Sequence, residues 1–187
     1  MTSPDLLPRE AGDGDIEWRS AVTAKPTPNG DAKQKSILDG VRVLDLSNVI
    51  AGPVAGRTLA EFGADVIRID SPAPLGGPRL TMWFGLDVNQ GKRAMVLDLK
   101  SAAGREVFAR MVSEADVVLH NFLDRSAESL GITHGQLTAI NPHIISCQIS
   151  AWGGPNGGPL KDDPAFDPVL QAASGIMSRF GTQDLPV

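Results

Sequence analysis

The sequence predicts an α/β fold: a Rossmann-like, mostly parallel sheet with helices on both faces. The first reason is that short apolar segments alternate with segments of helical character from about residue 38 onwards. Chains that alternate in this way form parallel sheets, because each helix returns the chain to the start of the next strand. The second reason is segment 43–70, where a strand, a small-residue turn, a helix and a second strand follow one another. The first turn of such a β-α-β unit is where these folds bring ligands close to the backbone.

The first elements follow from the apolar pattern and its breaks. A strand is expected over residues 41–46 and a helix over 54–62, because Gly63 occupies the position that commonly ends a helix. A second strand is expected over 65–69. The Pro- and Gly-rich connection over 71–91 is longer than a crossover needs, so a functional role is expected for it.

The later elements continue the alternation. The pattern predicts a strand over 94–99, a helix that Ser101 caps and that runs to about Ser113, and a strand over 115–120. Short helices are expected over 125–130 and 133–140, and a strand over 143–149. A loop rich in Gly, Pro and Asp, 151–164, then leads to a helix over 167–177.

The two ends of the chain differ from this pattern. Residues 1–37 are polar pieces separated by Pro and Gly, which predicts a flexible leader or a linker before the folded part, 38–187. The sequence stops at Val187 without a closing element. We therefore expect a cut at this point and an incomplete fold.

Composition narrows the classes of function. The net charge of −5 argues against nucleic acid or an anionic membrane as a partner. No apolar run is long enough to span a membrane, and no basic-then-apolar signal pattern begins the chain. Cys147 is the only cysteine and cannot form an internal disulfide, so a reducing, cytoplasmic location is expected. Its apolar strand context predicts a buried structural thiol.

Seven separated motifs follow one another between residues 40 and 178: GVRVLDLSNVIAGP, LAEFGADVIRIDSP, NQGKRAMVLDL, ADVVLHNF, LGITHGQL, NPHIISCQISAWG and FDPVLQAASGIMS. In this order they resemble those of the class III CoA-transferases (CaiB/BaiF type), the family of the formyl-CoA:oxalate and carnitine CoA-transferases and the α-methylacyl-CoA racemases. The resemblance covers about residues 38–187. Family members are about twice as long, so the resemblance identifies this chain as an N-terminal half, the CoA-binding part of the family's domain.

The resemblance implies a coenzyme A site along the C-terminal ends of the strands, with no metal. The matching positions are Ile50, Ala51, Ser71, Leu97, Asp98, Leu99, Lys100, Asn121, Phe122, Leu123, Ser129 and the segment from Pro164 to Asp167. Because CoA carries a pyrophosphate and a ribose phosphate, Lys100 can supply charge, and Arg125 can pair with phosphate or stack on adenine. Lys92 and Arg93 are weaker candidates, and solvated strand or helix ends are the alternative interpretation of all four cations.

Several positions depart from the family pattern. Other members often carry a cation where Ser71, Ser129 or Pro164 stands, so the phosphate contacts are expected to be fewer or relocated. Asp167 matches an acid near the CoA site of the family, although an N-cap role is the alternative. Phe166 stands where the racemases carry a proton-transferring histidine, which disfavours racemase chemistry. His120, His134 and His143 have no metal-ligand spacing and are expected to be structural.

The catalytic aspartate of the transferases is expected beyond Val187, so no residue of this chain is assigned as catalytic. Asp184 matches a loop acid that precedes it. The resemblance implies transfer of CoA from an acyl-CoA donor to a carboxylic acid through an aspartyl anhydride and an aspartyl-CoA thioester, by an enzyme that forms an intertwined homodimer. Two alternatives stay open: an acyl-CoA racemase, isomerase or lyase of the same family, and a non-catalytic CoA-binding remnant.

Overall fold

The computed structural model describes residues 36–72 and 84–180, all of which belong to one unit, 35–187. Most of the expected leader, most of the 71–91 connection and Asp184 therefore lie outside the described residues. Five parallel strands form a sheet in the order β3-β2-β1-β4-β5. They are β1 (Arg42–Asp45), β2 (Asp65–Asp70), β3 (Arg93–Val96), β4 (Val117–His120) and β5 (Ile145–Gln148). The parallel sheet is confirmed.

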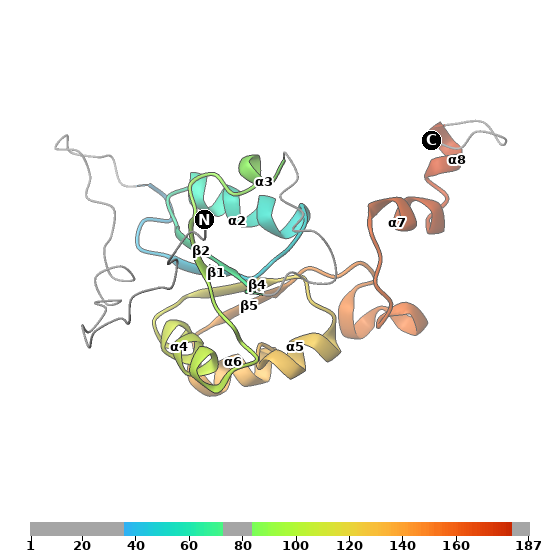
Figure 1. The fold of residues 1–187 in the computed structure, drawn as a ribbon. Helices are drawn as coiled ribbons and strands as arrows, with labels where there is room; N and C mark the ends of the chain where they lie inside the picture. Colours follow the sequence, from blue (N-terminus) through green and yellow to red (C-terminus); the bar gives the residue numbers. More distant parts are fainter. Residues whose placement is uncertain (1–35, 73–83, 181–187) are drawn as a thin grey trace, which may run out of the picture. The chain divides into compact units, whose positions relative to one another are not determined.

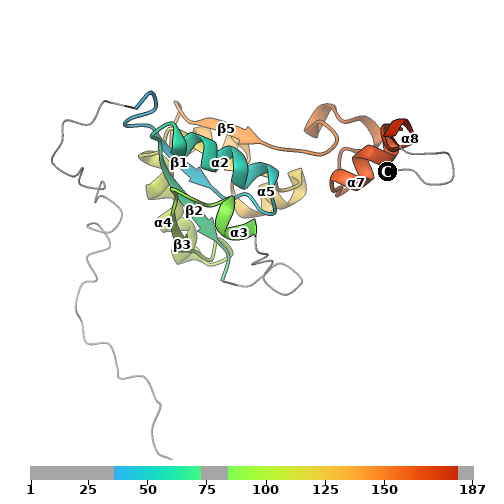
Figure 2. The ribbon, with the colours of Figure 1, turned by 90° about the horizontal axis from the view of Figure 1, so that it is seen from above.

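Helices lie on both faces of the sheet, as predicted (Figure 1). One side carries α2 (Ala51–Glu61) and the short α3 (Phe84–Asp87), which the sequence did not predict. The other side carries α4 (Ala102–Ser113), α5 (Asp124–Leu130) and α6 (His134–Ile140). Seen from above, α2 lies over the sheet (Figure 2).

Several helix ends are set by local chemistry, and those at Ser101 and Gly63 were predicted from it. The Ser101 side chain accepts a hydrogen bond from the Gly104 N–H at the start of α4, as expected of a cap. Thr133 and Gln136 form a capping box at the start of α6. Gly63 and Gly131 adopt positive φ angles of 97° and 76° after α2 and α5, the conformation that ends helices at low cost for glycine.

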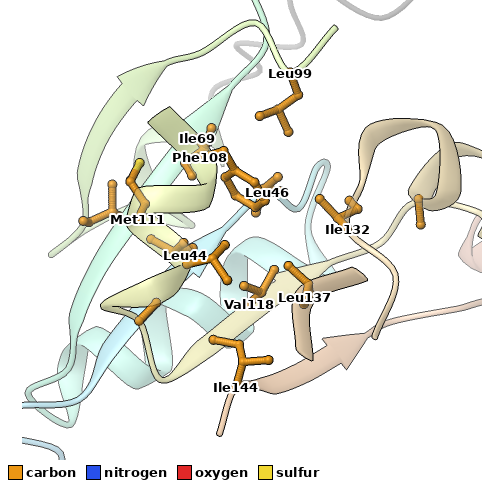
Figure 3. Close-up of a cluster of buried hydrophobic side chains, with 14 residues drawn as sticks. Leu44, Leu46, Ile69, Leu99, Phe108, Met111, Val118, Ile132, Leu137 and Ile144 are labelled. Atoms are coloured by element: carbon orange, nitrogen blue, oxygen red, sulfur yellow. The ribbon is translucent and has the colours of Figure 1, made fainter. Parts of the chain in front are cut away.

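The core is concentrated on the side of α4, α5 and α6. Leu44 and Val118 from the central strands pack there against Phe108, Met111 and Leu137 from the helices (Figure 3). On the α2 side the buried cluster is small: Val43, Val66 and Leu119 with Ala64. Apolar packing therefore stabilises the sheet mainly from the side of α4, α5 and α6.

Two predictions about the fold, for Cys147 and for the last helix, are wrong. Cys147 is exposed, because β5 is an edge strand and the neighbouring Ile145 on the same face is itself 61% exposed. The single helix expected over 167–177 is two helices, α7 (Asp167–Ala173) and α8 (Met177–Phe180). Gly175, with a φ of 72°, lies in the break between them. Neither α7 nor α8 has a buried residue.

Candidate functional site

The candidate site lies where the parallel strands end. β1 leads into the turn before α2, β3 into the segment Leu97–Lys100, and β4 into Asn121–Leu123. Because the strands are parallel, these segments share one edge of the sheet. The order reverses between β1 and β4, and the crevice at such a point is where open α/β sheets bind ligands.

Asn48 and Asn121 join the two segments at that crevice. The Asn48 backbone N–H donates to the Asn121 side-chain oxygen at 2.9 Å, and the Asn121 amide donates to the Asn48 carbonyl at 2.9 Å. Asn121 was predicted from the resemblance, whereas Asn48 was missed. The reciprocal pair fixes the β1–α2 turn against the end of β4.

The β1–α2 turn is exposed on the surface. Val49 has a φ of 70°, which is unusual for a β-branched residue. Ile50 is 47% exposed, Ala51 is also exposed, and no side chain caps the start of α2. A sparsely populated backbone conformation persists only where its surroundings hold it in place.

Two exposed cations, Lys100 after β3 and Arg125 after β4, have side chains with no hydrogen-bond or ion-pair partner among the described residues. In the turn after β3, the backbone N–H of Lys100 donates to the Asp98 carboxylate at 3.0 Å. Arg125 lies in the first turn of α5, next to Asp124, whose carboxylate accepts from Gln148 at 2.7 Å. Uncommitted cations of this kind are suited to bind phosphate.

The remaining predicted positions differ in what they can offer. Phe122 and Leu123 are half-buried, and the Leu99 side chain is in the core, so Leu99 offers only its backbone. Ser71 and Ser129 are exposed, and the Ser129 hydroxyl donates to the Ser126 carbonyl. Asp167 is exposed and is the first residue of α7, so the N-cap interpretation is wrong; Phe166 is the N-cap. The Asp167 carboxylate accepts a hydrogen bond from the Gln171 side chain within α7.

Lys92 and Arg93 both pair with carboxylates, and the burial of Lys92 contradicts its interpretation as a solvated strand end. The side chain of Lys92 is 1% exposed and its ammonium lies 2.7 Å from the Asp45 carboxylate, which is fully buried. Burial lowers the pKa of Lys92, while its hydrogen bond to Asp45 acts in the opposite direction. Arg93 pairs with Asp65 at 2.7 Å.

His120 ends β4 directly before the predicted segment Asn121–Leu123. It is 2% exposed, and its Nδ1 atom has no hydrogen-bond partner in the described part of the chain. Burial lowers the pKa of His120, while the nearby Asp124 carboxylate acts in the opposite direction. Its structural assignment stays a prediction. The described residues also hold no group of three or more His, Cys, Asp or Glu side chains placed to bind a metal ion.

Sequence comparison finds that this chain is similar to CoA-transferases. The model of CoA-transferase family III matches residues 38–187. The CoA-transferase/lyase DddD of Marinomonas sp. is 39% identical over 155 residues, covering 83% of this chain and 18% of its own. The acetyl-CoA:oxalate CoA-transferase of Acetobacter aceti is 37% identical over 169 residues, covering 86% of this chain and 42% of its own.

Solved structures agree with the sequence matches. Rv3272 from M. tuberculosis superposes with a TM-score of 0.72 at 34% identity, covering 81% of this chain and 42% of that one. A CaiB/BaiF family protein from Brucella suis gives a TM-score of 0.71 at 34% identity, covering 82% and 43%. The chain therefore spans less than half the length of these relatives. Among the described residues, no helix is long and apolar enough to cross a membrane.

Proposed function

The chain belongs to CoA-transferase family III, and on that basis we propose that it is the CoA-binding part of an enzyme that transfers coenzyme A from an acyl-CoA donor to a carboxylic acid. The observation that carries the proposal is the convergence of three elements at one sheet edge. These are the exposed turn at Ile50 and Ala51, the Asn48–Asn121 pair, and the free cations Lys100 and Arg125.

The role that we assign to each part of the site follows from the chemistry of CoA. Its phosphates need positive charge and hydrogen-bond donors. We assign Lys100 and Arg125 to the phosphates, and the backbone around Ile50 and Ala51 to close contact with the ligand. Ser71, Leu97–Leu99, Phe122, Leu123, Ser129 and Asp167 stay predictions from the family pattern.

The proposed reaction is covalent catalysis by an aspartate that does not lie among the described residues. Its carboxylate attacks the donor thioester carbonyl, and the C–S bond breaks to give a mixed anhydride and CoA thiolate. The thiolate attacks the aspartyl carbonyl, which releases the donor acid and leaves an aspartyl-CoA thioester. The acceptor carboxylate attacks this thioester and frees the thiolate. The thiolate then takes the acceptor acyl group from the second anhydride and restores the aspartate.

A lyase step is the second candidate, because the DddD relative is named both a transferase and a lyase. A product analysis separates the two: transfer alone yields acceptor-CoA and the intact donor acid, whereas a lyase also releases an eliminated fragment. The homodimer and the cytoplasmic location stay predictions.

The test is CoA binding by calorimetry to the protein in its natural length, with the variants Lys100→Gln and Arg125→Gln. Each should weaken CoA binding by about tenfold, the loss of one charge-assisted contact worth about 1.4 kcal/mol. The matched control is Arg110→Gln, an exposed arginine in the last turn of α4, near the opposite edge of the sheet. Equal affinity in all three variants would refute the assignment of the phosphate site.

A further inference from the structure

The ion pair between Asp45 and Lys92 is buried directly beneath the β1–α2 turn. The two side chains are 0% and 1% exposed, with the ammonium 2.7 Å from the carboxylate. Such a pair is expensive to remove from water, and it is tolerated only when every donor and acceptor is satisfied. That condition is met here, because the Lys92 ammonium uses all three of its donors: on Asp45, on the Pro53 carbonyl at 2.7 Å and on Asn89 at 3.0 Å.

The pair holds the β1–α2 turn at both of its ends. At the strand end, the second carboxylate oxygen of Asp45 accepts from the backbone N–H of Ser47 at 2.9 Å and from the Ser47 hydroxyl. At the helix end, Lys92 holds the carbonyl of Pro53. Between these points lie Val49, with its unusual φ of 70°, and the exposed residues predicted to meet the ligand.

The sequence of α2 makes room for this arrangement. A Cβ atom at Gly56 would lie 2.5 Å from the Asp45 carboxylate and 3.1 Å from the Lys92 ammonium, and one at Gly52 would collide with Ser47. The two glycines are four residues apart and therefore face the same side of the helix. α2 can approach the end of β1 only because both side chains are absent.

We propose that Lys92, acting through Asp45 and Pro53, is a positioning residue that holds the Asn48–Ala51 turn in the conformation that receives coenzyme A. This inference rests on the proposed function. Lys92 itself has no free donor for a phosphate. Its effect on binding passes through the backbone of the turn, which distinguishes it from Lys100 and Arg125.

The test compares Lys92→Met with the double variant Asp45→Asn/Lys92→Met in the natural-length protein. The single variant leaves a carboxylate buried without its partner, and the double variant removes that charge. Both lack the donor to Pro53. We expect CoA affinity to fall by about tenfold or more in both, even where the double variant recovers stability. Full recovery of affinity in the double variant would show that Lys92 only neutralises Asp45, which would overturn the proposal.

Two further measurements separate a positioning role of Lys92 from a general loss of stability. Amide hydrogen exchange in residues 47–53 should accelerate about tenfold in Lys92→Met, with the amides of α6 unchanged. The matched control is Val112→Ala, a fully buried change in α4 that should lower stability and leave CoA affinity intact. Where Lys92→Met does not fold, Gly56→Ala replaces it, because its methyl displaces the same pair with both charges kept.

The outcomes separate the two proposals. If the unchanged protein binds no CoA, the proposed function fails, and hydrogen exchange alone decides whether the pair holds the turn. If the unchanged protein binds CoA, and Lys92→Met binds it equally well with exchange in 47–53 unaltered, the positioning role fails and the proposed function stands.

Discussion

Among the described residues, fourteen buried apolar residues form one cluster on the side of the sheet that carries α4, α5 and α6, whereas the side under α2 holds a cluster of four. The α2 side instead buries the Asp45–Lys92 pair and brings a helix with two inward-facing glycines close to the strand end. Apolar burial is non-directional and rewards total area. An ion pair with hydrogen bonds fixes particular atoms. Apolar burial is therefore concentrated on one face of the sheet, and the contacts that fix the geometry of the candidate site lie on the other.

The largest expected effect is that of a substitution in the main apolar cluster, on the side of α4, α5 and α6, and it tests whether the two faces are independent. Leu137 is completely buried, with 0% of its surface accessible to water. Leu137→Ala should lower the free energy of unfolding by about 2–5 kcal/mol, because it opens a cavity in the main cluster. Denaturant unfolding measures the loss. CoA affinity at low denaturant should match that of the unchanged protein, and a parallel loss would mean that the two faces are not separate.

The second prediction compares two helical glycines. Gly56→Ala in α2 should lower stability by about 1–3 kcal/mol through crowding of Asp45, although alanine favours helices. Gly135→Ala in α6 has nothing within 4 Å of the new methyl and should raise stability by about 0.5 kcal/mol. Thermal unfolding of both variants decides. Stabilisation by both would show that the α2 side has room to spare.

The third prediction concerns pH and His120, the polar exception on the core face. Since burial lowers the pKa of His120 below its ordinary 6.5, the unfolded chain binds a proton before the folded one does. Stability should therefore be full above pH 6.5 and fall as the pH drops from there toward the lowered pKa. His120→Gln should flatten this dependence. Unfolding curves between pH 7 and 5 measure the difference.

The smallest expected effect is at the part of the α2 side that no described helix covers. Ile145 on β5 is 61% exposed, so Ile145→Thr should change the free energy of unfolding by less than about 0.5 kcal/mol. It should nevertheless reduce self-association, because exposed apolar edge strands pair with other chains. Light scattering tests this. A large loss of stability instead would mean that β5 is packed on both faces.

The sequence predicted the order and type of most elements, because their signals are local. Alternation predicted the five strands, and Ser101 and Gly63 marked helix ends. The break before α8 was missed, since the apolar pattern continues through Gly175. Periodicity identified β5 as a strand but could not show that it is an edge strand, and Cys147 was therefore misplaced.

The candidate site was predictable to a lesser degree. Ile50, Lys100 and Asn121 follow strand ends, and Arg125 lies in the first turn of α5, so the sequence placed them near one edge of the sheet, while their role in binding stays a prediction. The role of Lys92 was not visible, because its partner Asp45 is 47 residues away in the sequence. Pairings of this kind depend on the sheet order, which places β3 beside β2 and β2 beside β1. Local patterns carry no information about such contacts.

The exposed thiol of Cys147 has a practical consequence. It is the only cysteine in the sequence and lies on the edge strand, so maleimide chemistry can attach a single spectroscopic probe at one known position. A fluorophore placed there would report by its emission whether another polypeptide comes to rest against β5. The same thiol makes a reductant advisable during purification, because air oxidation can join two copies through Cys147.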